Sequence, residues 1–417
     1  MLATSLALLG LSLGQVPADE PLPPVQAGPP SVELLGGAEV GPELVAGAWA
    51  LQVRPTLSLE LSADFGAQLG PPLRFAGTGP LGLRAEDWDE RSDLGQLLQS
   101  LSAGGTGRPV QFRAGELRSF TLGHGHLIAG YSNRVNEDYH PAGAQLIAFA
   151  GPVAMEAVAS DVLAARMFAG AVRATTGDER FHAELSALHD FGLAGGVAPP
   201  LSLLQLDLDA GLFRGPLFWL NAFLGGGARV GVPDPSGGGE VGFSVDARNG
   251  ALSLGGRLEA RMLRGGYRPG MVGLGYEVAR LAGTGFQGVP LADERLPPAF
   301  SAFFELQFAH AARGASVSGV AQVEAFTAGR TDARAWLTAE LLSGWLAATG
   351  MVEVVGLGSA PRVLAQGEAR VRFWPSLYAA ARVGTGFRPA PGGGLERSVT
   401  AGVALGADFD LVPGARL

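Results

Sequence analysis

The chain has 417 residues, of which 47% are hydrophobic and only 17% charged, and its formal net charge is −9. This charge argues against nucleic acid as a partner, because nucleic-acid-binding proteins carry basic surfaces. The absence of cysteine excludes disulfides and thiolate metal sites. The mean hydropathy of +0.23 is high for a soluble protein. A membrane-spanning helix, however, needs about 18–20 consecutive apolar residues, and beyond the N-terminal segment the hydrophobic residues are spread along the chain.

The N-terminal segment has the pattern of an export signal. An apolar stretch over residues 6–13 leads to the small-residue sequence Val16-Pro17-Ala18, which suits cleavage by a signal peptidase. We therefore predict a signal peptide over 1–18 and a Pro-rich lead-in over 19–30. The alternative is an ordinary disordered terminus.

Residues 56–69 read TLSLELSADFGAQL, and every second side chain from Leu57 to Leu69 is apolar. The positions between them are polar or glycine. We expect a single fourteen-residue strand here, whereas strands in soluble proteins average about 5–6 residues. One wholly apolar face over such a length is typical of a strand that crosses a bilayer.

Residues 71–140 interrupt this alternation. The segment DWDERSDLGQLLQSL places leucines at helical spacing, and Asp93 could cap that helix. Long connections outside a sheet tend to be functional, so we predict an inserted loop or plug over 71–116. It would lie in the lumen or dock at the rim, and the alternative is an exposed loop with one helical turn. The candidate loop or plug residues are Asp87, Trp88, Asp89, Asp93, His124 and His126.

His124 and His126 would project from the same side of a strand and could offer two nitrogen ligands to zinc or copper. A third ligand would have to come from Glu137, Asp138 or His140. The neighbouring glycines indicate close backbone approach instead. We favour hydrogen-bonded polar side chains that face a lumen, and we predict no metal and no cofactor.

Period-two alternation returns in the rest of the chain, for example in SLLQLDLDAGL, LSLGGRLEARM and RVLAQGEARVRF, with glycine-rich turn signals between segments. The alternating segments number 16 to 20. We predict 16 strands, with 18 as the alternative, because bacterial barrels favour even numbers. The polar faces supply the expected lumen-lining residues Arg257, Glu259, Arg261, Glu305, Gln307, Arg334, Glu340, Glu368, Arg370 and Arg372.

A closed barrel accounts for both the alternation and the strand lengths. No backbone polar group can stay unpaired in hydrocarbon, so a membrane sheet must close on itself. We therefore predict an all-β fold, a transmembrane antiparallel up-and-down β-barrel over 31–417. A soluble β-solenoid or β-sandwich is the less favoured alternative.

Over almost all of this range the sequence resembles Gram-negative outer-membrane β-barrels of the porin-like kind. The segment DWDERSDLGQLLQSL and the later FTLGHGHLIAGYSN resemble myxobacterial outer-membrane barrels, a group that includes barrels similar to gliding-motility components. The resemblance implies the bacterial outer membrane, its lipid and the barrel-assembly machinery as partners, and in the second case other envelope proteins. Such barrels usually end on an aromatic residue. Here the last expected strand contains Phe409, and the segment DLVPGARL follows this residue.

Two functions stay open. A porin-like channel for small hydrophilic solutes fits the charged polar faces, and a structural barrel of a trans-envelope complex fits the interruption at 71–140. We do not expect an enzyme. The chain has no cysteine nucleophile and no Gly-x-Ser-x-Gly sequence, and His182 and His189 fall on opposite faces of their strand.

Overall fold

The computed structural model describes residues 33–76, 82–105, 107–135, 139–164, 166–193, 198–232, 236–283, 289–358, 361–389 and 395–411. The predicted signal peptide and lead-in lie outside the described residues. Within these ranges, no helix has the length and apolar character needed to cross a membrane.

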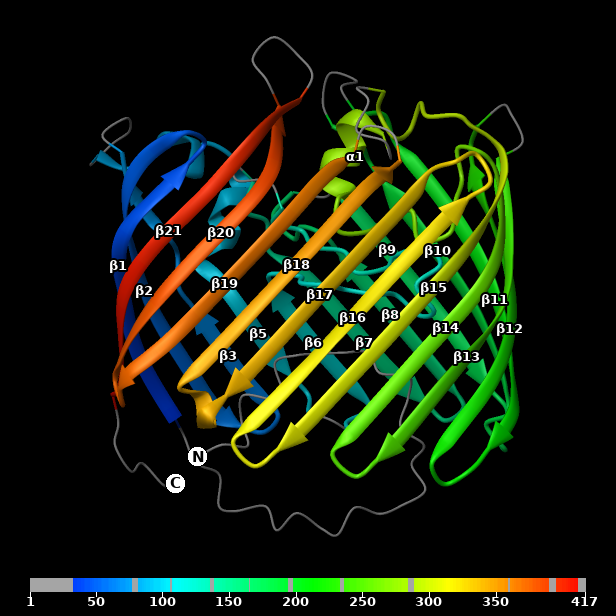
Figure 1. Ribbon diagram of the computed structural model, residues 1–417, viewed down its shortest axis with the longest axis horizontal. Coiled ribbons are helices and arrows are strands. Elements are labelled where there is room, and N and C mark those ends of the chain that lie inside the picture. Colours follow the sequence, from blue (N-terminus) through cyan, green and yellow to red (C-terminus); the bar gives the residue numbers. More distant parts are fainter. Residues whose placement is uncertain are drawn as a thin grey trace.

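The described strands form one antiparallel sheet that closes on itself (Figure 1). Strand β1 (Glu33–Val45) pairs with β2 (Ala48–Ser62) on one side and with β21 (Leu395–Asp410) on the other, which completes the ring. Both β3 (Phe65–Leu69) and β4 (Leu73–Phe75) pair with β2, so they share one position. The twenty-one strands of the described residues therefore make a barrel of twenty positions.

The other strands follow in chain order around the ring, each antiparallel to the next. They are β5 (Leu98–Ala103), β6 (Val110–Gly115), β7 (Gly143–Ala150), β8 (Val153–Ala159), β9 (Met167–Thr175), β10 (Phe181–Asp190), β11 (Leu201–Arg214), β12 (Phe218–Val230), β13 (Gly237–Asn249), β14 (Leu252–Gly265), β15 (Leu296–Ala312), β16 (Ala315–Phe326), β17 (Thr331–Leu341), β18 (Leu346–Leu357), β19 (Arg362–Trp374) and β20 (Leu377–Pro389). The helices within the described residues are the 3-10 helices η3 (Ala85–Asp87), η4 (Arg91–Leu97) and η6 (Leu342–Gly344), and the α-helix α1 (Tyr276–Ala282).

The predicted strand number, 16 or 18, is wrong, and the stretch 56–69 shows one reason. It is a hairpin of β2 and β3 with its turn at Ala63 and Asp64, and not one strand. Leu57 pairs with Leu69 and Leu59 with Ala67, so odd positions face odd positions beyond the bulge between Glu60 and Ser62. The alternation therefore passes through the hairpin without a slip, and the sequence pattern alone hides the turn.

The second reason lies in the range 71–140, which we expected to interrupt the sheet. The structure places β4, β5 and β6 of this range in the barrel wall. The described residues between β4 and β5 carry η3 and η4, and the long excursion 116–142 follows β6. β5 and β6 are six residues each. Such short strands, separated by 3-10 turns and glycines, carry too few alternating positions to stand out in the sequence.

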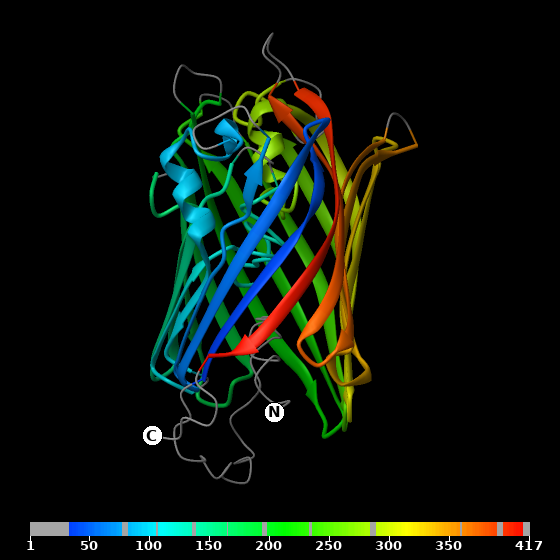
Figure 2. The same cartoon turned by 90° about the vertical axis from the view of Figure 1, so that its left-hand side faces the viewer.

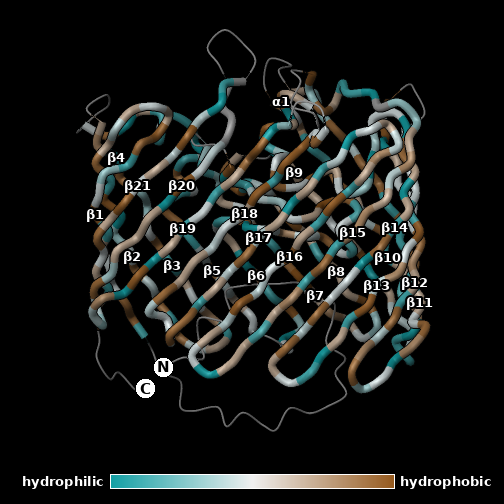
Figure 3. The backbone as a smooth tube through the Cα atoms, viewed as in Figure 1, coloured by the Kyte–Doolittle hydropathy of each residue, from teal (hydrophilic) through white to brown (hydrophobic). Residues whose placement is uncertain are grey.

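The barrel is apolar outside and polar inside. On β11, Leu204, Leu206 and Leu208 are 41–49% exposed, whereas the intervening Gln205 and Asp207 are 1–2% exposed. Figure 3 shows the resulting mixture of hydrophobic and hydrophilic positions along each strand. A bilayer requires this arrangement, with apolar side chains toward lipid and polar side chains toward the lumen.

The two ends of the barrel differ. The beginning of β1 and the end of β21 lie at one end of the barrel, as an even number of strand positions requires, and α1 lies at the other end (Figure 1, Figure 2). Connections at the terminal end are short, as at Gly250 and at Gly314. The two longest connections, 116–142 and 266–295, start from the opposite end.

The outward and inward faces predict opposite responses to an added charge. Val403 points outward at mid-strand on β21, and Val403→Arg should lower the free energy of unfolding in lipid vesicles by about 2–4 kcal/mol. Gln366 is one of the inward-facing residues of β19, and Gln366→Arg should change the free energy of unfolding by less than about 1 kcal/mol. Denaturant titration of both variants checks this, and equal losses would contradict the assigned faces.

Candidate functional site

Two connections from distant parts of the sequence fold together inside the barrel. They are 116–142, between β6 and β7, and 266–295, between β14 and β15, and their described residues are called the plug below. The plug contains a hydrophobic core, in which the side chains of Leu127, Tyr131 and Leu274 are almost completely buried. The same core includes inward apolar side chains of the wall, such as Leu188 on β10 and Leu203 on β11, so the two connections pack against each other and against the wall.

Backbone pairing joins the two halves of the plug. Ile128 and Val272 form a parallel bridge, the amide of Ala129 donates to the carbonyl of Val272 over 2.9 Å, and the amide of Gly270 donates to the carbonyl of His126 over 2.7 Å. Tyr131 donates its hydroxyl hydrogen to Glu277 of α1 over 2.6 Å. Burial, followed by the charge of Glu277, raises the pKa of Tyr131 well above its usual range, so the phenol stays a donor.

α1 is fastened to the wall at β10. Arg280 forms ion pairs with Asp190 at 2.6 Å and with Glu277 at 3.0 Å, and the hydroxyl of Tyr276 also donates to Asp190. All four side chains are buried. A buried arginine between two carboxylates is costly to expose or to leave unpaired, so α1 has one preferred position against β10.

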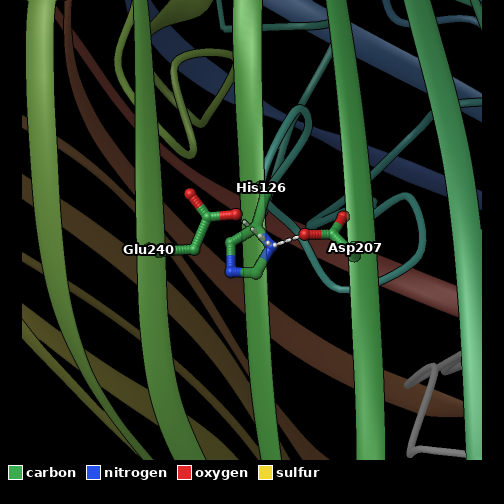
Figure 4. A group of neighbouring side chains, drawn as sticks. All are labelled: His126, Asp207 and Glu240. Carbon is green, nitrogen blue, oxygen red and sulfur yellow. Dashed lines mark hydrogen bonds and ion pairs between the residues drawn. The ribbon is translucent and has the colours of Figure 1, made fainter.

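The two histidines of the plug face two aspartates of β11. His124 Nε2 lies 2.7 Å from Asp209 Oδ2, and His126 Nδ1 lies 2.7 Å from Asp207 Oδ1 (Figure 4). The imidazole rings are stacked with their centroids 6.2 Å apart. The two-residue spacing of the histidines thus matches the two-residue spacing of inward side chains on a strand.

His126 reaches two further carboxylates. Its Nδ1 lies 3.3 Å from Glu240 Oε1 on β13, and its Nε2 lies 3.2 Å from Glu259 Oε1 on β14. Burial by itself would lower the pKa of His126, but the hydrogen bonds to Asp207 and Glu259 raise it to about 9. The imidazole therefore binds protons well above neutral pH and fastens the plug to three strands.

Wall arginines hold the plug through its backbone. Arg257 on β14 donates to the carbonyl of His124, and Arg334 on β17 donates to the carbonyl of Ala129. In the reverse direction, Arg268 of the plug forms an ion pair with Asp332 of β17 at 3.2 Å. These contacts, with those to β10, β11 and β13, cover one side of the ring.

The ten residues predicted to line the lumen all occupy inward positions of their strands. Most are paired with one another or with neighbours on the wall. Glu259 binds Arg257 at 2.9 Å and Arg261 at 2.5 Å. The other contacts are Glu305 with Gln307 at 2.7 Å, Arg334 with Gln322 at 2.8 Å, Glu368 with Arg382 at 3.0 Å, Arg370 with Glu39 at 3.2 Å and Arg372 with Asp408 at 2.6 Å, while Glu340 is half-buried.

Of the predicted loop or plug residues, the structure brings only His124 and His126 into the plug. Asp87 is the buried last residue of η3 and accepts hydrogen bonds from Arg74 and Arg84, and Asp93 accepts from the backbone of Glu90 at the start of η4. Trp88 is half-buried and Asp89 is exposed.

Of the three suggested third ligands, His140 lies near Asp87, with its Nε2 3.8 Å from the carboxylate. It is therefore not part of the group around His126. Glu137 and Asp138 lie outside the described residues.

Sequence reasoning missed the second half of the plug and the wall residues Asp207, Glu240 and Asp190. The segment 266–295 also breaks the alternation and contains glycines and prolines. Its length could therefore have indicated a second long connection outside the sheet. The wall carboxylates had no such signal, because each looks like any other inward polar residue.

The sequence matches no protein-family model and no curated protein. Solved structures with a related arrangement are bacterial porins. A BenF-like porin from Pseudomonas fluorescens Pf-5 is 9% identical, with a TM-score of 0.37 over 91% of this chain and 99% of that chain. OccD3 (OpdP) from Pseudomonas aeruginosa is 9% identical, with a TM-score of 0.36 over 93% and 94%. A porin refined at 1.8 Å is 11% identical, with a TM-score of 0.34 over 91% and 100%. At these values the likeness carries no information about function.

The plug should loosen when its histidine anchor is removed. Removing one partner of a buried ion pair costs about 3–5 kcal/mol, so His126→Ala should speed amide hydrogen exchange over 119–132 by roughly 100-fold or more. His124→Ala is the matched control, because His124 has one carboxylate partner and a side chain that is 27% exposed. Mass-spectrometric exchange on the folded chain measures both, and equal acceleration would contradict the assigned anchor.

Proposed function

We propose that this chain is an outer-membrane channel for small hydrophilic solutes and that the plug narrows its lumen without sealing it. The closed sheet with an apolar outer face and a polar inner face supports the membrane location. A ring of 16–18 strands already leaves an aqueous channel unless it is filled, and this ring has twenty positions.

The observation that carries the proposal is the difference between the two sides of the lumen. The plug is fastened to β10, β11, β13, β14 and β17. Two positions beyond β17, on β19, the inward side chains of Glu368 and Arg370 are 31% and 35% exposed. Inward side chains that remain exposed to solvent border a water-filled space. We therefore infer that a water-filled path runs between the plug and this wall.

Charged groups of both signs border this path. Arg118, at the neck of the plug, is 61% exposed and lies in the field of Glu116 and Glu368. Glu116 keeps a pKa of about 2 despite its burial, because Arg118 and Arg134 stabilise its charge. The Nε atom of Arg54 on β2 is buried and has no hydrogen-bond partner among the described residues. Such a set would orient polar solutes and give modest ion selectivity.

Single-channel conductance in a planar bilayer tests the proposal. It is measured for the full chain and for a variant that lacks residues 119–132, which form the tip of the first plug connection. Leu117 and Asn133 are hydrogen-bonded across its neck, from the amide of Asn133 to the carbonyl of Leu117 over 3.2 Å, so residues 119–132 can be replaced by two glycines. We expect steady steps from the full chain and larger steps from the shortened one.

Silence from the full chain with large steps from the variant would mean that the plug seals the lumen, which contradicts an open channel. Silence from both would contradict the channel function altogether. It would favour the structural barrel of a trans-envelope complex.

Arg118 should influence the ion selectivity of the path. Arg118→Gln removes an exposed positive charge, so the anion-to-cation permeability ratio, measured as the reversal potential in a salt gradient, should fall roughly twofold. Arg264→Gln is the control, because Arg264 points outward from β14. An equal change in the permeability ratio of the two variants would contradict the position of Arg118 beside the path.

A further inference from the structure

We propose that His126, Asp207 and Glu240 form a binding site for a divalent transition-metal ion such as Zn²⁺, which would link the plug to the barrel wall. The three residues come from the plug, β11 and β13 (Figure 4), and all three are buried. One ligand atom of each lies within 4.8 Å of the other two.

The distances suit a small ion after a minor adjustment. Zn²⁺ binds histidine nitrogen and carboxylate oxygen at about 2.0–2.2 Å, which puts neighbouring ligand atoms roughly 3.3 Å apart in a tetrahedral site. His126 Nδ1 is 3.3 Å from Glu240 Oε1 and 2.7 Å from Asp207 Oδ1. To reach this spacing from His126, Asp207 Oδ1 has to move by about half an ångström.

A glycine makes room for this group. Asp207, Gly225 and Glu240 lie in one row across β11, β12 and β13. Gly225 has no side chain, so both carboxylates lean over it and His126 fits between them, in front of the middle strand of Figure 4. A β-carbon at Gly225 would collide with Glu240 Oε1 and Asp207 Oδ1.

The second nitrogen of His126 is already oriented for metal binding. Nε2 faces Glu259 at 3.2 Å, and a ligating histidine in a metal site commonly donates its other N–H to a carboxylate. Glu259 is itself held by Arg257 and Arg261. With Nε2–H donated to Glu259, a metal ion would replace the proton on Nδ1, and the nitrogen would then present its lone pair on the side of Asp207 and Glu240.

An unsatisfied atom points to a missing partner. Glu240 Oε2 is buried and has no hydrogen bond, which is costly for a carboxylate. The amide of Gln205 donates to Asp207 Oδ1 and to Glu240 Oε1, the two oxygens that also face His126 Nδ1, so it holds both carboxylates in place beside the imidazole. Glu240 could bind a divalent ion through both of its oxygens. The negative charges of Asp207 and Glu240 would then balance the two positive charges of the ion, with His126 neutral.

Binding of Co²⁺, a visible probe for zinc sites, to the full refolded chain tests this inference. We expect about one ion per chain, with the strong visible absorption of four-coordinate cobalt, and its displacement by Zn²⁺. Glu259→Gln should weaken binding by about 10–100-fold, the usual effect of losing a group that orients a ligand. No binding by the wild-type chain would overturn the proposal.

Gly225→Ala gives a sharper comparison, because it removes no ligand. It should abolish binding, whereas Gly226→Ala, next to it but outward, meets only a backbone oxygen at 3.4 Å and should bind as the wild type. His310→Ala, on the exposed outer face, controls for adventitious surface binding and should also leave the stoichiometry unchanged.

Equal binding by Gly225→Ala and Gly226→Ala would overturn the proposed site. So would wild-type affinity in a His126→Gln chain. Binding is measured without any current, so its failure would leave the channel proposal standing, and a silent bilayer would leave the metal site standing.

Discussion

The need to pair every backbone N–H and C=O inside hydrocarbon determines the rest of this structure. It forces the sheet to close, and closure through the β1–β21 pairing leaves no free edge. A closed ring in lipid must then turn its apolar side chains outward and its polar ones inward. With twenty positions the ring is too wide for inward side chains to fill, so its interior depends on chain segments that leave the wall and fold within it.

The plug solves two problems that oppose each other. Its backbone and apolar side chains need a core, and 116–142 and 266–295 provide one jointly around Ile128 and Val272. Its surface packs partly on inward apolar side chains of the wall, such as Leu188 and Leu203, and otherwise faces charged wall residues. Buried charge pairs therefore set its position, as between Arg280 and Asp190 or Arg268 and Asp332. Such pairs add little net stability compared with apolar packing, but a wrong position would leave a buried charge unpaired. The anchoring is consequently specific and one-sided.

The sequence predicted the direction of side chains far better than the number of strands. Leu206 and Asp207 point as the alternation requires, because period two is a property of the single strand. The strand number depends on where turns fall, and the hairpin at Ala63 keeps the period intact, so it leaves no mark in the pattern. The short strands β5 and β6 carry too few positions to be recognised. Strand number is thus set by the turns and the ring closure, to which the pattern is insensitive.

The site around His126 shows the same limit in three dimensions. The spacing of His124 and His126 marked a pair of parallel side chains, and Asp207 and Asp209 form an equally spaced pair on β11. Nothing in the sequence brings these pairs together, since they are about eighty residues apart. What aligns Asp207 with Glu240 is the register of β11 on β12 and of β12 on β13, and what lets them meet is the missing side chain of Gly225. A glycine that leaves a gap in the wall is therefore as informative as the charged residues beside it, because it determines where a loop from inside the barrel can contact the sheet.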